Sequence, residues 1–284
     1  MSDLQELTIK INLLRNFLKK NSINEYSINS IEYFLTNEFS YLTNLTFKKQ
    51  INRFQRVTVN SRICNGNQQR LYKIDQLIYP PNGAKKYGRA NIIGDKILYG
   101  TDDIPTALME ARVKENDLVT ISNWKLKTNH SLCIAPIFKN SPTRSDVISI
   151  DFFDLYRLHW DTINKLFNPE ERAIADKFVQ FLTDCFTKDV DENNHFDYFL
   201  SSFYANRLFN FLDNGSIEAI LYPSMRNDLI TTNIAMKHDV FNNNYELENI
   251  EENIVIESPF GINNFCKLKP MAYTKVFKGN EIIW

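Results

Sequence analysis

The feature that most constrains the fold is the stretch 87–110, where a loop, a strand and a helix follow one another closely. Two glycines bracket a polar loop that carries Arg89 and Asn91, and a turn then leads into a short apolar strand containing Tyr99. Two aspartates and a proline follow, which is typical of a helix N-terminus, and Glu110 lies on that helix. We therefore expect an arginine, a tyrosine and a glutamate to converge on one cleft.

Composition supports a sizeable core and argues against charged macromolecular partners. The 284 residues are 43% hydrophobic and include 21 Phe and 13 Tyr, enough for one large domain or two small ones. The formal net charge of −1 gives no global attraction to nucleic acid or to an anionic membrane. The sequence opens without a basic, apolar signal segment, and no apolar run reaches membrane-spanning length. We expect a cytoplasmic protein that binds neither nucleic acid nor membrane.

Cysteine and histidine positions argue against a disulfide framework or a metal site. Four cysteines are scattered along the chain without short spacings. His130 and Cys133 have the spacing of a ligand pair, but no second pair accompanies them. We therefore predict no metal site.

Residues 1–50 have the pattern of a small helical layer. Leucines and isoleucines at helical spacing predict a helix over 3–20, and Ser27 or Ser30 is expected to cap a second helix. The apolar stripe fits packing against the main domain, a partner-binding arm, a gate over a cleft or an oligomer contact. We favour packing against the main domain, because no glycine-rich tether would let the segment swing away.

Residues 51–284 alternate between strand and helix patterns, which predicts a mixed α+β fold. A buried strand is expected to end just before Ser224, which is either a turn serine or a site residue. Arg56 is either a solvent-facing strand residue, slightly favoured, or an inward cation for an anionic ligand. We expect helices at 168–185 and 196–214 and strands at 54–59, 97–99, 118–124, 132–135, 217–222, 254–257 and 272–277.

Several known motifs do not fit. The glycines are too widely spaced for a dinucleotide fingerprint or a phosphate loop, and Ser224 lacks the flanking glycines of a nucleophile elbow. Lys85 and Lys86 form a basic patch with Tyr87 and Arg89, but the near-neutral chain weakens an RNA-binding interpretation. Paired-carboxylate glycosidase chemistry stays open, although the sequence offers no second acid to name.

Two separated motifs resemble the RES domain, a family named for an arginine, a glutamate and a serine. The first runs from Gly88-Arg89-Ala90-Asn91 through Leu98-Tyr99 to Thr106-Ala107-Leu108-Met109-Glu110. The second is Ile217 to Ser224 with Asn233-Ile234-Ala235. The resemblance covers roughly residues 50 to 245. It implies a fold similar to ADP-ribosyltransferases and diphtheria-type toxins, with 51–284 as an NAD-binding catalytic domain and 1–50 as an added helical segment.

The resemblance also implies site residues. The family's glutamate and serine correspond to Glu110 and Ser224. Arg56 is our choice for the naming arginine, and Arg89 matches the glycine-flanked loop. The implied substrate-binding residues are Arg89, Asn91, Asn233 and a ring-stacking tyrosine, which is Tyr79, Tyr87 or Tyr99.

Characterised members of the family are toxins that deplete NAD⁺. The resemblance implies an NAD⁺ glycohydrolase or phosphorylase that uses NAD⁺ as a substrate and holds no bound cofactor. It also implies a bacterial toxin or defence effector with a separate antitoxin or inhibitor protein. The alternatives are a protein ADP-ribosyltransferase and a non-catalytic nucleotide-binding protein. The chain departs from the compact members in its N-terminal helices and in a longer helical insert, about 165–214.

Overall fold

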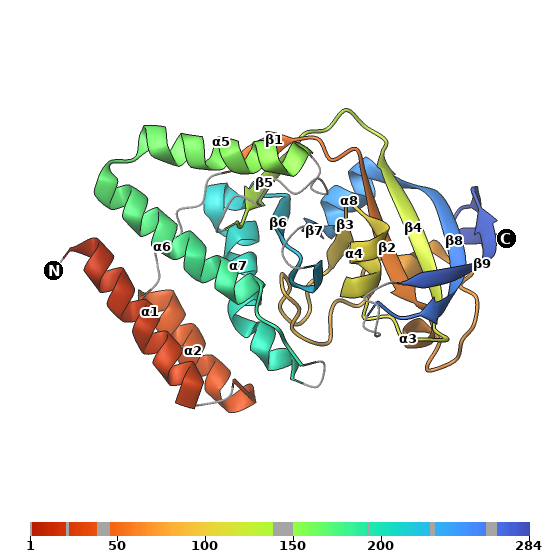
Figure 1. Cartoon of the computed structure of the whole chain (residues 1–284), viewed down its shortest axis with the longest axis horizontal. Coiled ribbons are helices and arrows are strands. Elements are labelled where there is room, and N and C mark those ends of the chain that lie inside the picture. Colours follow the sequence, from red (N-terminus) through yellow and green to blue (C-terminus); the bar gives the residue numbers. More distant parts are fainter. Residues whose placement is uncertain are drawn as a thin grey trace.

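The structure, a computed structural model, describes residues 2–20, 23–38, 46–138, 150–191, 194–227, 231–259 and 266–284. Within these ranges it contains eight α-helices and a nine-stranded mixed sheet, the predicted α+β class. Most of the helices gather at one end of the molecule and the longest strands at the other (Figure 1). None of the helices in the described ranges is both long and apolar enough to cross a membrane.

The large sheet is antiparallel except where β5 pairs with β6 in parallel. Its strand order is β1 (Phe47–Lys49), β5 (Leu132–Pro136), β6 (Ala219–Pro223), β7 (Thr232–Lys237), β3 (Ile97–Thr101), β2 (Arg53–Val59), β4 (Leu118–Leu126), β8 (Tyr245–Glu257) and β9 (Lys267–Thr274). A separate two-stranded ribbon joins β10 (Val276–Lys278) to β11 (Glu281–Ile283).

The sheet opens between β2 and β3. These two strands share a single pair, Gln55 with Thr101, whereas β2 pairs with β4 from Arg53 to Val59. Across this opening the Arg56 guanidinium donates a hydrogen bond of 2.8 Å to the carbonyl oxygen of Tyr99. A side chain therefore replaces part of the missing backbone ladder, and the opening leaves space for a cleft.

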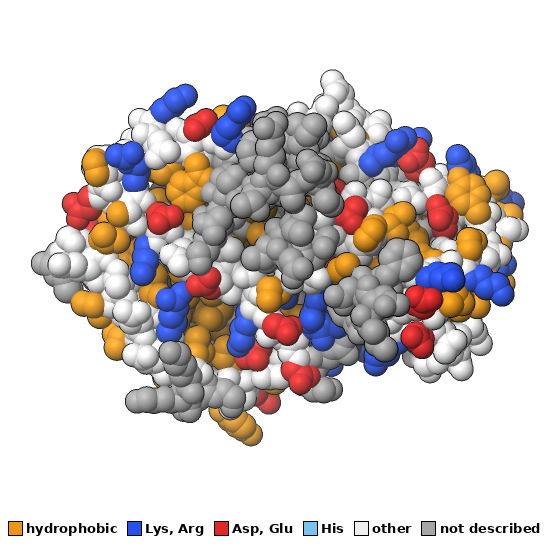
Figure 2. All heavy atoms as spheres, viewed as in Figure 1, with side chains coloured by type: hydrophobic (Ala, Val, Ile, Leu, Met, Phe, Trp, Pro, Cys, Tyr) orange, Lys and Arg blue, Asp and Glu red, His pale blue; other side chains and the backbone are white. Residues whose placement is uncertain are grey.

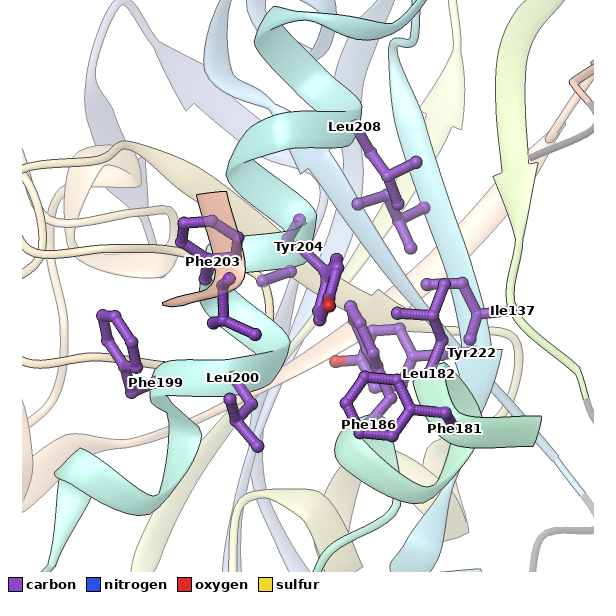
Figure 3. Close-up of a cluster of buried hydrophobic side chains, with 14 of the residues drawn as sticks. Ile137, Phe181, Leu182, Phe186, Phe199, Leu200, Phe203, Tyr204, Leu208 and Tyr222 are labelled. Carbon is purple, nitrogen blue, oxygen red and sulfur yellow. The ribbon is translucent and has the colours of Figure 1, made fainter. Parts of the chain in front are cut away.

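The N-terminal helices share a core with the helical insert. Buried side chains of α1 (Asp3–Lys20) and α2 (Glu25–Glu38) join one cluster with those of α6 (Pro169–Phe186) and α7 (Phe199–Asn210), and α5 (Ile150–Leu166) precedes α6. Figure 3 shows the aromatic part of this cluster around α7. β1 lies within 1–50 but pairs with β5, so these 50 residues also supply an edge strand of the main sheet.

The opposite face of the sheet carries a second core under α8 (His238–Asn244), and α4 (Ile104–Glu110) packs on a third. The short helix α3 (Asn60–Ile63) follows β2 directly. Four 3₁₀ turns complete the described elements: η1 (Ile74–Leu77), η2 (His195–Tyr198), η3 (Leu212–Gly215) and η4 (Met225–Asn227). On the face drawn in Figure 2, acidic and basic side chains are interspersed over the described surface.

Local signals predicted many of the elements, but β1, α3, α5, β7, α8 and β11 are among those not predicted, and four expected elements differ in their bounds or caps. α2 begins at Glu25 because the Asn24 side chain, not Ser27 or Ser30, accepts the backbone N–H bonds of the first turn. The expected strand 272–277 is two strands separated at Lys275, where the Thr274 hydroxyl accepts from the backbone N–H of Val276. β8 starts at Tyr245, well before 254. The expected helix 196–214 consists of η2, α7 and η3.

Candidate active site

A cleft of about 350 Å³ lies where β2 and β3 separate. Its walls come from elements that are far apart in the sequence, namely β2, α3, η1, the loop before β3, β3 itself, α4, η2, β6 and β7. The charged and polar side chains that face it include Arg56, Arg62, Arg89, Tyr99, Glu110, Tyr198, Tyr222 and Asn233.

Glu110 is placed at the cleft by a short, well-capped helix. The Asp103 carboxylate accepts a hydrogen bond of 2.8 Å from the backbone N–H of Thr106, and Pro105 occupies the first turn, as the sequence predicted. α4 then ends at Glu110. This geometry carries the carboxylate from the helix end into the opening between the strands.

Two neutral donors hold one oxygen of Glu110. The Ser224 hydroxyl and the Asn233 side-chain amide each donate to Oε1 at 2.7 Å. Ser224 is completely buried just beyond β6, and Asn233 lies on β7. Among the described residues none bonds Oε2 and none forms an ion pair with Glu110. The carboxylate is therefore fixed in orientation while its second oxygen is left for a ligand.

Arginines give the rest of the cleft a positive lining. Arg89 donates to the carbonyl oxygen of Phe186 at 2.6 Å, and its guanidinium lies 5.2 Å from the ring centroid of Tyr198. Burial lowers the pKa of Arg56 to about 10, which leaves it charged at neutral pH. With Arg62, three cations face one acid, Glu110, among the described lining residues.

The loop that carries Arg89 is tied to β3 by Tyr99. The Tyr99 hydroxyl donates to the Asn91 side-chain oxygen at 2.8 Å and accepts from the backbone N–H of Ala90 at 2.8 Å. A Cβ atom at Gly88 would overlap the Asn91 side chain, so the loop requires glycine there. Asn91 thus supports the loop from outside the cleft lining, while Tyr99 is itself a lining residue.

The other two tyrosine candidates do not face the cleft. Tyr79 exchanges hydrogen bonds with Asn242 and packs edge-on to Phe241, in the core on the opposite face of the sheet. Tyr87 packs edge-on to Phe199 beneath the helical insert. Of the three proposed stacking tyrosines, the structure brings only Tyr99 to the site.

Sequence reasoning missed Tyr198, Tyr222 and Arg62. Tyr222 precedes Ser224 by two residues on a strand, so the period of two places both side chains on the same face. That signal was available. Tyr198 comes from η2 in the helical insert, and no local pattern connects it to Glu110.

The His130 and Cys133 pair has a structural role at the sheet edge. Glu218 bonds His130 Nε2 through one carboxylate oxygen at 2.8 Å and accepts from the backbone N–H of Cys133 through the other at 2.7 Å. Within the described ranges, no group of three or more His, Cys, Asp or Glu side chains is arranged to hold a metal ion.

The cleft combines one open carboxylate oxygen, several guanidinium groups and tyrosine rings. Such a set suits a ligand that carries both anionic groups and a hydroxyl or a developing positive charge. A comparison with models of known protein families finds no match for this chain, and a search of curated protein sequences finds none either.

Proposed function

We propose that this protein consumes NAD⁺ by breaking the bond between nicotinamide and ribose, with Glu110 as the catalytic carboxylate. The observation that carries the proposal is the arrangement of Glu110 itself. Ser224 and Asn233 both bond Oε1, and the arginines of the cleft are bonded to backbone carbonyl oxygens instead. The carboxylate therefore keeps its negative charge uncompensated beside a cavity.

An uncompensated carboxylate suits the chemistry of this bond. Nicotinamide leaves as a neutral ring, so positive charge develops on the ribose in the transition state. A fixed negative charge stabilises that state, and a carboxylate oxygen also accepts a hydrogen bond from a ribose hydroxyl. Glu110 Oε2 is the atom we assign to both tasks.

The arginines suit the other end of the substrate. A guanidinium binds two phosphate oxygens at once through its planar fork, which fits the pyrophosphate of NAD⁺. We assign this role to Arg56 and Arg89, both of which line the cleft. Tyr99 and Tyr198 supply aromatic surface on which the nicotinamide ring would stack.

These assignments agree with the resemblance to the RES domain in its arginine, glutamate and serine. They also give the serine a specific role. The Ser224 hydroxyl donates to Glu110, and its side chain is buried. Ser224 is therefore a positioning residue for the carboxylate, and the acceptor of ADP-ribose stays open among water, phosphate and a protein side chain.

Incubating the purified chain with NAD⁺, with and without phosphate, tests the proposal. Nicotinamide release is the expected result, and chromatography of the products identifies free or phosphorylated ADP-ribose. Mass spectrometry of the protein detects attached ADP-ribose, which would favour a transferase. Binding of NAD⁺ without nicotinamide release would instead favour the non-catalytic nucleotide-binding alternative.

A further inference from the structure

Tyr222 lies in the same row of side chains as the residues that hold Glu110. It is the direct cross-strand partner of Asn233 in the antiparallel pair of β6 and β7. Directly opposed residues of such a pair project to the same face of the sheet. Tyr222 therefore projects toward the face on which Asn233 bonds Glu110, and it lines the cleft.

The Tyr222 ring is fixed, while its hydroxyl has no partner within the described part of the chain. The side chain is 3% exposed, and its ring centroid lies 5.3 Å from that of Phe186. Among the described residues none makes a hydrogen bond with the hydroxyl, although the ring itself packs within the buried cluster around α7. A phenol held rigidly beside a cavity without a partner is a donor available to a ligand.

Tyr204 shows that an unpartnered hydroxyl alone is not sufficient. Both tyrosines belong to the same buried cluster, shown in Figure 3. The Tyr204 hydroxyl is also without a partner among the described residues, but it is sealed inside the core and Tyr204 does not line the cleft. Both residues are buried tyrosines with the same hydroxyl group. They differ because a ligand in the cleft can reach Tyr222 but cannot reach Tyr204.

The protonation state of the Tyr222 hydroxyl determines whether it acts as a hydrogen-bond donor or as a base. Burial raises its pKa well above the usual value, and the nearby Tyr99 and Glu110 raise it further. The hydroxyl is thus a donor at physiological pH and not a base. Glu110 beside it is an acceptor, and a donor next to an acceptor matches an alcohol, which can accept from one and donate to the other.

We propose that the Tyr222 hydroxyl donates a hydrogen bond to the ribose hydroxyl whose proton Glu110 Oε2 accepts. Tyr222 is then a further substrate-contacting residue that recognises the nicotinamide ribose. This inference rests on the proposed function for its substrate, and it extends that function by naming how the ribose is recognised.

The test compares Tyr222→Phe with Tyr204→Phe, each of which removes one hydroxyl. ADP-ribose affinity is measured by calorimetry and nicotinamide release by steady-state kinetics. We expect Tyr222→Phe to weaken ADP-ribose binding and to lower kcat/KM about tenfold, the effect of one lost hydrogen bond, with Tyr204→Phe close to the parent in both. With NAD⁺ analogues that lack the 2′- or the 3′-hydroxyl of the nicotinamide ribose, the effect of Tyr222→Phe should disappear for one of the two.

The outcomes separate the inference from the proposed function. ADP-ribose binding that depends on Tyr222, without nicotinamide release by the parent, would support the inference and overturn the proposed reaction. Nicotinamide release by the parent with Tyr222→Phe unchanged in both measurements would overturn the inference alone. An equal loss in Tyr204→Phe would also overturn it, because the effect would then come from the core. A parent that binds no ADP-ribose and releases no nicotinamide would overturn both.

Discussion

Glu110 and Glu252 are held in opposite ways. Glu252, on β8, is 3% exposed and accepts from two guanidinium nitrogens of Arg70, at 2.7 and 3.0 Å. Arg70 in turn lies 4.8 Å from the ring centroid of Trp284. Among the described residues, Glu110 is bonded only by Ser224 and Asn233, both neutral. The Arg70 cation therefore neutralises the charge of Glu252. The neutral donors orient Glu110 but leave its negative charge available to a ligand.

This difference separates a structural carboxylate from a reactive one. The ion pair of the buried Glu252 with the partly exposed Arg70 joins β8 to the segment before η1, so its role is structural. At the cleft, three arginines are present, yet none of the described ion pairs involves Glu110. The carboxylate of Glu110 and the guanidinium groups therefore do not neutralise one another. A site for a substrate that carries both positive and negative charge requires this separation.

Apart from changes to Glu110 itself, removing both neutral donors should have the largest effect on activity. We expect Ser224→Ala combined with Asn233→Ala to lower nicotinamide release on the order of 100-fold, because Glu110 would lose its fixed orientation. Steady-state kinetics measures the loss, and circular dichroism verifies the fold. Turnover at the parent level would show that the two bonds to Oε1 do not matter for catalysis.

Removing the cation of the structural pair should lower stability instead. Arg70→Gln leaves Glu252 buried without its counter-charge, and we expect the free energy of unfolding to fall by about 2 kcal/mol. Urea denaturation measures it. The control is Arg53→Gln, since Arg53 pairs with Glu248 on the surface and its side chain is 67% exposed; such pairs contribute little. Equal effects of the two variants would contradict the assignment.

The cleft arginines should act on substrate binding. Arg56→Lys and Arg89→Lys keep the positive charge but lose the planar guanidinium group that binds two phosphate oxygens at once. We therefore expect KM for NAD⁺ to rise about tenfold in each variant, with a smaller change in kcat. Thermal melts control for the lost bonds to backbone carbonyls. If both variants bind NAD⁺ like the parent, neither arginine contacts the pyrophosphate.

Asp102 is a third carboxylate, with neither a cation nor a full set of donors. Its Oδ1 is buried without a partner among the described residues, and burial together with Asp103 raises its pKa to about 6. The folded state then binds the proton more tightly than the unfolded chain, so Asp102 contributes stability below about pH 4 that is lost as pH rises through about 6.

We therefore expect Asp102→Asn to stabilise the protein by about 1 kcal/mol at pH 8 and to change little at pH 4. Thermal unfolding at the two pH values measures the difference. The control for losing a carboxylate charge is Glu115→Gln, because Glu115 is exposed. Asp117→Asn would not serve, because the Asp117 carboxylate accepts from the backbone N–H of Lys114 in a turn. A pH-independent effect of Asp102→Asn would contradict the raised pKa.

The sequence predicted the parts of the site that local rules determine. Asp103 and Pro105 indicated the helix that ends at Glu110, alternation indicated β2, and apolar runs indicated β3 and β6. The contacts of Glu110 with Ser224 and Asn233 depend on the order of strands in the sheet. Local patterns do not predict that order, so only the resemblance to a known family indicated these contacts. The sequence could not predict that Tyr198 lines the cleft, because the position of η2 depends on how α6 and α7 pack.

The most direct test of the account is nicotinamide release by Glu110→Gln. Glutamine keeps the shape of the side chain and an oxygen that can accept from Ser224 and Asn233, but it removes the negative charge. We predict a loss of about 100-fold or more with an unchanged melting temperature, while Glu115→Gln, on the exposed turn after α4, releases nicotinamide like the parent. Release by Glu110→Gln at the parent rate would contradict the claim that this carboxylate drives the reaction.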